Sequence, residues 1–175
     1  LQYFAYRTGK TPFQVADKEA SAAVKQSFLE VTGKYATEND IKETQLDITY
    51  AKNMRLTPEK IRDMDTDVEK FPEIFRTYNA KLRQMQMIDY DDQMIYALRI
   101  LEQYPEVLAH FREQYRYFCV DEAQDTSKIQ HDMIDLLAAQ SRNLFMVGDE
   151  DQSIYGFRAA YPQACISFED RQRGW

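Results

Sequence analysis

The sequence has no long apolar run, and this absence argues against a helix that crosses a membrane. Its longest uninterrupted apolar stretches are four or five residues, whereas a membrane span needs roughly 20. The first ten residues also lack the basic start, apolar stretch and small-residue cleavage site of a secretory signal. We therefore expect no membrane partner.

Cysteine is also scarce. Cys119 lies in an apolar, strand-like run and Cys165 in an expected helix, and two such residues do not form a disulfide framework. This usage predicts reduced thiols in a cytoplasmic protein. Hydrophobic residues nevertheless make up 44% of the chain and aromatic residues 13%, enough to fill a packed core and to argue against disorder.

The net charge of −7 is spread unevenly along the chain. Residues 1–85 hold 14 Lys and Arg against 13 Asp and Glu, a balance of +1, and residues 86–175 hold 8 against 16, a balance of −8. An acidic second part suits a site that collects a divalent cation. A solvated acidic surface explains the same composition, so the choice between them depends on motifs.

The first hundred or so residues predict helices. Apolar spacing and capping signals mark each one: a left-handed end at Gly33, a capping box from Thr37 to Asp40, and prolines at first-turn positions. The expected helices cover about residues 22–32, 38–51, 58–64, 72–85, 91–101 and 105–115.

The pattern then changes to strand, helix, strand. Residues 117–120 and 144–147 are continuous apolar runs, typical of strands that are buried on both faces, and residues 127–140 have helical spacing. This order predicts a βαβ unit with parallel strands. We expect a helical domain over residues 1–114 and a βαβ domain over residues 115–175, closed by a helix near 161–173.

Acidic residues follow both expected strands, where a parallel α/β sheet places its ligands. Asp121 and Glu122 follow the first strand, and residues 149–151 (DED) follow the second. In such a pair, one carboxylate can anchor Mg²⁺ while the other deprotonates an attacking water. An acidic pair alone also fits an ordinary solvated strand end.

The surrounding residues point to one family. Residues 120–126 (VDEAQDT) and 147–158 (VGDEDQSIYGFR) resemble motifs II and III of the superfamily 1 helicases of the UvrD/PcrA/Rep group. The resemblance implies an α/β fold, with a mostly helical 1B-like subdomain joined to part of a RecA-like parallel sheet, an incomplete P-loop NTPase fold. It also implies an ATP-dependent, 3′ to 5′ DNA helicase that serves repair, replication restart or recombination.

The resemblance further implies a role for each motif residue. Asp121 would hold Mg²⁺, Glu122 would be the catalytic base, and Gln152 would contact the γ-phosphate of ATP and take part in catalysis. Tyr155 and Phe157 would stack on DNA bases, which is a sequence-tolerant contact, although core packing is their alternative. The remaining DNA-binding residue is Arg158.

Two shorter segments resemble the same family. Residues 48–53 (ITYAKN) are similar to a stretch of the 1B insertion, and residues 89–92 (DYDD) to the junction where that insertion returns to the motor domain. Lys52 and Arg55 would contact duplex phosphates or lie on a solvated helix face. In motif II, Gln124 has no assigned role, and Asp125 also fits a cap for the helix beginning at Ser127.

A phosphate-binding loop of the form GxxxxGK[ST] is missing. Gly9, Lys10 and Thr11 match only its end, because Phe4 stands where the first glycine belongs and Pro12 would interrupt the following helix. We therefore expect a fragment that works with the remaining helicase domains of its chain on single-stranded and duplex DNA, and that is inactive alone. The alternatives are a non-catalytic DNA- or partner-binding module and, less favoured, a nuclease.

Overall fold

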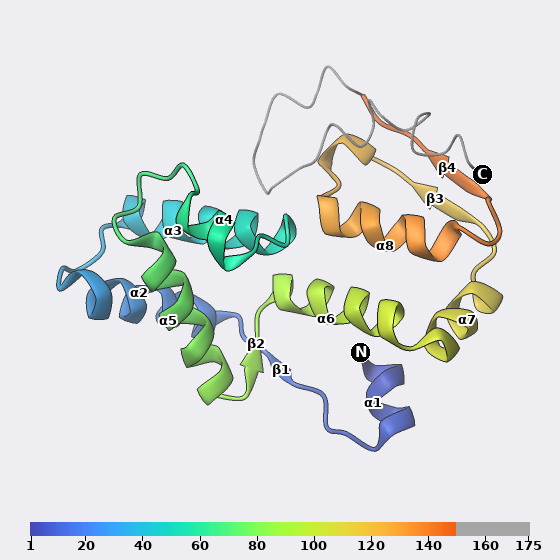
Figure 1. Cartoon of the computed structure of the whole chain (residues 1–175), viewed down its shortest axis with the longest axis horizontal. Coiled ribbons are helices and arrows are strands. Elements are labelled where there is room, and N and C mark those ends of the chain that lie inside the picture. The colour runs from blue at the N-terminus through green and yellow to red at the C-terminus, as the bar shows by residue number, and fades with distance from the viewer. Residues whose placement is uncertain (150–175) are drawn as a thin grey trace. The chain divides into compact units, whose positions relative to one another are not determined.

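The computed structural model describes residues 1–149 and divides the chain into two compact units, residues 1–95 and 96–175 (Figure 1). This division lies before the expected boundary at residue 114, and the assignment of residues 1–114 and 115–175 to two subdomains stays a prediction. No helix among residues 1–149 has the length and apolar character to cross a membrane.

Helices dominate the first unit, and several of their ends coincide with signals in the sequence. The helix over residues 2–8 was not expected, and the helix expected from about residue 22 begins at Lys18. Thr37 accepts a hydrogen bond from the backbone N–H of Asp40, whose carboxylate accepts one from the backbone N–H of Thr37. Gly33 ends the preceding helix with a φ of 73°, a conformation that glycine adopts without steric cost. The helices are α1 (Gln2–Thr8), α2 (Lys18–Thr32), α3 (Glu38–Asn53), α4 (Pro58–Arg62) and α5 (Phe71–Gln84).

The core of this unit forms where α2 packs against α5, which Figure 1 shows side by side. Apolar residues in the helix expected over residues 22–32 should face the core: Val24 and Phe28 of α2 are buried, whereas Leu29 is exposed. From α5, Ile74, Tyr78 and Leu82, each four positions from the next, are almost wholly buried. The core therefore depends on residues three or four positions apart on facing helices.

A short parallel strand pair was not predicted. β1 (Gln14–Val15) pairs with β2 (Met87–Ile88), and the backbone N–H of Ala16 donates to the carbonyl of Ile88 at 2.8 Å. Each strand has two residues, too few for a periodic signal, and the partners lie far apart in the sequence. The carboxyl end of β2 brings Asp89 to the beginning of α6 (Tyr90–Gln103).

The second unit contains the predicted βαβ arrangement. β3 (Phe118–Val120) and β4 (Leu144–Met146) are parallel and in register from Phe118 opposite Leu144 to Val120 opposite Met146. α8 (Lys128–Ala138) connects them, and α7 (Pro105–Gln114) packs on α8 (Figure 1). The mixed content of helices and small parallel sheets is compatible with the expected α/β class.

The prediction that both strands are buried on two faces is wrong for the part of the chain that the structure describes. Cys119 lies opposite Phe145 in the register, so their side chains share one face of the pair. That face is exposed, and Phe145 keeps 65% of its surface accessible. Continuous apolar runs are ambiguous here, because they also fit a strand pair covered on one side. The helix expected near 161–173, with Cys165, lies outside the described residues.

Candidate functional site

The ends of β3 and β4 meet at one edge of the sheet. The backbone N–H of Val147 donates to the carbonyl of Val120 at 2.8 Å, and that of Ala123 donates to the carbonyl of Val147 at 2.9 Å. These bonds hold the loop after β3 beside the loop after β4. Asp121 and Glu122 lie on the first of these loops, and both are exposed to solvent. The acidic pair is therefore open to a ligand at the edge where the sequence predicts one.

Glu122 has an unusual backbone conformation. Its φ is 50° and its ψ 45°, in the left-handed region that residues with a side chain rarely adopt. The carboxylate of Asp121 accepts a hydrogen bond from the backbone N–H of Glu122 at 3.0 Å, and the carbonyl of Glu122 accepts one from Asp125 at 2.9 Å. Strained backbone of this kind gathers at functional positions, where the surrounding structure maintains it.

Gln124 connects the two loops from inside. Its side chain amide is buried, with only 3% of the residue exposed. Nε2 donates to the Glu122 carboxylate at 2.7 Å, and Oε1 accepts from the backbone N–H of Asp149 at 3.0 Å. Sequence reasoning left this residue without a role, because nothing in its spacing shows that the second loop passes beside it.

The assignment of Mg²⁺ to Asp121 stays a prediction. No group of three or more possible ligating side chains occurs within residues 1–149. Mg²⁺ is usually bound through one or two carboxylates, with water and phosphate completing its six ligands. Asp121 is an exposed carboxylate at the end of β3 and could supply one such ligand to Mg²⁺.

Asp125 is not the cap of α8. The backbone N–H of Ser127 donates to Oε1 of Gln130 at 2.8 Å, so Ser127 and Gln130 form the helix start. The S-x-x-Q spacing is a capping-box signal that the sequence contains. The family-typical Asp125 itself is exposed.

Four other predicted site residues lie outside the described residues: Gln152, Tyr155, Phe157 and Arg158. At the opposite end of the chain, Gly9 ends α1 with a φ of 66° and does not follow a strand. This local structure agrees with the rejection of Gly9, Lys10 and Thr11 as a phosphate-binding loop, since such a loop links a strand to a following helix.

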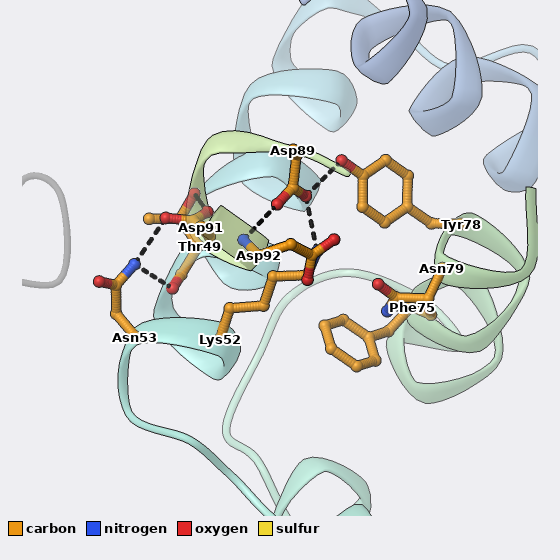
Figure 2. Close-up of polar contacts among 9 residues, drawn as sticks. All are labelled: Thr49, Lys52, Asn53, Phe75, Tyr78, Asn79, Asp89, Asp91 and Asp92. Carbon is orange, nitrogen blue, oxygen red and sulfur yellow. Dashed lines mark hydrogen bonds and ion pairs between the residues drawn. The ribbon is translucent and has the colours of Figure 1, made fainter. Parts of the chain in front are cut away.

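The first unit contains a second polar cluster, built by the two shorter motifs (Figure 2). Nζ of Lys52 lies 2.6 Å from Asp89 and 2.8 Å from Asp92, and the hydroxyl of Tyr78 donates to Asp89 at 2.7 Å. The Lys52 side chain is only 3% exposed. The expectation that Lys52 contacts duplex phosphates or lies on a solvated face is therefore wrong: this lysine is buried between two carboxylates. For the exposed Arg55, a phosphate contact stays a prediction.

Asp91 forms the other side of the cluster. It accepts hydrogen bonds from the Thr49 hydroxyl at 2.9 Å and from Nδ2 of Asn53 at 2.8 Å. Burial raises the pKa of Asp91, although these two hydrogen bonds oppose that shift. Burial also raises the pKa of Asp92, against the attraction of Lys52. Residues of the two shorter motifs thus attach the end of α3 to the beginning of α6.

Burial and the neighbouring Asp89 carboxylate raise the pKa of the Tyr78 hydroxyl well above its usual range. This hydroxyl therefore stays protonated and donates to Asp89 at any ordinary pH. Tyr78 lies within the helix expected over residues 72–85, whose apolar spacing indicates no polar contact. The sequence contains no signal for its polar role, because the partner arrives from β2.

Comparison with known proteins decides the family. The family model described as the UvrD/REP helicase N-terminal domain matches residues 1–173. The chain belongs to this family. Two relatives are named ATP-dependent DNA helicase PcrA: that of Leuconostoc citreum is 38% identical over 124 residues, and that of Staphylococcus aureus strain Mu50 is 37% identical over 124 residues. In both, the matched segment covers 70% of this chain and 17% of the relative.

Membership of the UvrD/REP family confirms the resemblance that the acidic and glutamine-containing motifs indicate. It also agrees with the described geometry, in which the two motif loops share one edge. The matched segment spans about a sixth of the length of these relatives.

Proposed function

We propose that this chain is the part of an ATP-dependent DNA helicase that activates the attacking water and links ATP hydrolysis to DNA. The observation that carries the proposal is the joining of the loops after β3 and β4 through Gln124, which holds Glu122 beside the backbone of Asp149. In a parallel sheet, this edge is where ligands bind.

In the proposed reaction, Glu122 is the general base. Its carboxylate takes a proton from water as the water oxygen forms a bond to the γ-phosphorus of ATP. The bond between that phosphorus and the β–γ bridging oxygen breaks, and ADP leaves with the electron pair. The exposure of Glu122 and its strained, fixed backbone support this role, since a base must reach the water in one defined position.

Asp121 would hold Mg²⁺, which neutralises charge on the phosphates when it is bound. Asp121 also accepts a hydrogen bond from the backbone N–H of its neighbour Glu122. Gln152 would contact the γ-phosphate, and Tyr155, Phe157 and Arg158 would contact a single DNA strand. These four residues enter the proposal through the family resemblance.

In the whole protein, the remaining helicase domains would supply the phosphate-binding loop and the second wall of the nucleotide site. We propose movement in the 3′ to 5′ direction on DNA, within the cytoplasm. Residues 1–114 would be the helical 1B-like subdomain, and residues 115–175 part of the RecA-like motor domain. The relatives carry the name of ATP-dependent helicases, which does not favour a non-catalytic module.

The test is Glu122→Gln in the whole protein that contains this chain. The amide cannot accept the proton from water but keeps the shape of the side chain, so kcat should fall by orders of magnitude while nucleotide affinity stays nearly unchanged. Glu113→Gln is the matched control, because Glu113 is an exposed glutamate of α7 in the same unit. If Glu122→Gln lowers kcat no more than Glu113→Gln does, Glu122 is not the general base.

A further inference from the structure

We propose that Gln124 is a positioning residue that ties the Glu122 side chain to the loop after β4, so that the position of this loop controls ATP hydrolysis. The inference depends on the proposed function, because it takes Glu122 to be the general base. Gln124 itself is buried and would act through Glu122.

Donor and acceptor chemistry allows one orientation of the Gln124 amide. The backbone N–H of Asp149 can only donate, so it must face Oε1, at 3.0 Å. Nε2 is then directed at Glu122, whose ionised carboxylate can only accept, at 2.7 Å. Both ends of the amide are therefore matched to partners on different loops. Among residues of similar size, neither glutamate nor methionine provides a donor and an acceptor together.

The surroundings of the Gln124 amide are closely packed. Gln124 is 3% exposed and Ala123 beside it 2% exposed. A Cβ added to Gly148 would lie 2.7 Å from Oε1 of Gln124, 3.2 Å from its backbone nitrogen and 3.3 Å from the Cβ of Ala123. The glycine allows the second loop to approach this closely, and the approach brings the N–H of Asp149 within reach of Gln124.

This arrangement makes the Glu122 carboxylate sensitive to the loop after β4. Displacing that loop breaks the hydrogen bond from the backbone N–H of Asp149 to Oε1 of Gln124, which orients the amide. The Gln124 amide then no longer holds the carboxylate of Glu122, which is otherwise exposed. The residues that the family resemblance assigns to the γ-phosphate and to DNA follow Asp149 closely in the sequence: Gln152, Tyr155, Phe157 and Arg158. Gln124 would thus be the link through which contacts at that loop change the catalytic geometry.

The deciding experiment measures DNA-stimulated ATPase of the whole protein with the variants Gln124→Met and Gln124→Glu. Methionine loses both hydrogen bonds, whereas glutamate keeps an acceptor for Asp149 but loses the donor to Glu122. Since a hydrogen bond to a charged group contributes enough to change a rate about tenfold to hundredfold, we expect kcat to fall by that factor in both. KM for ATP should stay within about twofold of the unaltered protein, because Gln124 does not position the ground-state nucleotide.

Gln140→Met is the matched control, because Gln140 is an exposed glutamine of the same unit. This substitution should leave kcat unchanged. Gly148→Ala supplies a second variant that leaves Gln124 in place but displaces its amide. It should lower kcat like Gln124→Met, and the two changes together should lower kcat no further than one of them, because both remove the same link.

A folded Gln124→Met or Gln124→Glu protein with kcat within about threefold of the unaltered protein would overturn the inference. Fully multiplicative effects of Gln124→Met and Gly148→Ala would also overturn it. Measuring Glu122→Gln in the same assay distinguishes a failure of the proposed function from a failure of the role inferred for Gln124. If Glu122→Gln is mild, the proposed function fails. If it abolishes turnover while the Gln124 variants are normal, only the inference about Gln124 fails.

Discussion

Replacing Lys52 by methionine tests the account of the buried cluster most directly. Methionine keeps most of the length of the lysine stem but removes the ammonium group that lies between Asp89 and Asp92. Lys52 is 3% exposed, Asp89 9% and Asp92 18%, so solvent does little to compensate the two carboxylates. Lys52→Met therefore leaves two buried negative charges facing each other and the neighbouring Asp91.

Breaking a buried ion pair by removing one partner costs about 3–5 kcal/mol. For a unit of this size, each kcal/mol lowers Tm by about 4–8 °C, so the expected decrease is about 10–40 °C. Because total stability is about 5–15 kcal/mol, the variant should keep only a fraction of it. The cost should shrink as the pH falls, since burial raises the pKa of Asp92 and its protonation removes one of the unpaired charges.

Thermal unfolding of the 175-residue chain, followed by circular dichroism, measures this change. Lys34→Met is the control, because Lys34 pairs with Glu69 at 3.1 Å on the surface, where the side chains are 70% and 55% exposed. Loss of that screened pair should leave Tm nearly unchanged. A decrease for Lys52→Met no larger than for Lys34→Met would refute the reasoning that Lys52 holds the cluster together.

Two further predictions concern Asp91 and the isolated chain. Burial raises the folded-state pKa of Asp91, so its charge lowers stability progressively as the pH rises above the ordinary value of 3.8. In urea unfolding near neutral pH, Asp91→Asn should therefore be at least as stable as the unaltered chain, since the amide can accept a hydrogen bond from Asn53 and donate one to Thr49. This advantage should vanish near pH 3.8. A variant less stable than the unaltered chain at neutral pH would contradict the prediction. The isolated chain should show negligible Mg²⁺-dependent ATPase, because phosphate positioning supplies most of the catalysis of phosphoryl transfer; robust hydrolysis by the purified chain, compared with its Glu122→Gln variant, would show this expectation to be wrong.

Several helix ends were predictable because their signals are local. Thr37 with Asp40 caps α3, Thr57 precedes Pro58 at the start of α4, and Gly33 ends α2, as the sequence predicts. Each of these contacts joins residues within one turn, so it needs no knowledge of the fold. The parallel pairing of β3 with β4 was also predicted, from the strand–helix–strand order.

Long-range pairing was not predictable in the same way. The strands β1 and β2 are too short to leave a pattern, and the burial of Lys52 depends on β2 bringing Asp89 beside it. A lysine in a helical sequence is normally solvated, so its local context gave the opposite expectation. The role proposed for Gln124 likewise depends on the close approach of Gly148 from the other loop.

The sequence alone determined the family, the order of helices and strands, and the residues that follow each strand, because motifs and caps are properties of neighbouring residues. Tertiary structure decided which of these polar residues meet: Gln124 with Glu122 and Asp149, and Lys52 with Asp89 and Asp92. It also decided that one face of β3 and β4 stays exposed within the described residues. The physical reason is that burial and hydrogen-bond partners arise from segments distant in the chain, and side-chain periodicity carries no information about which segments those are.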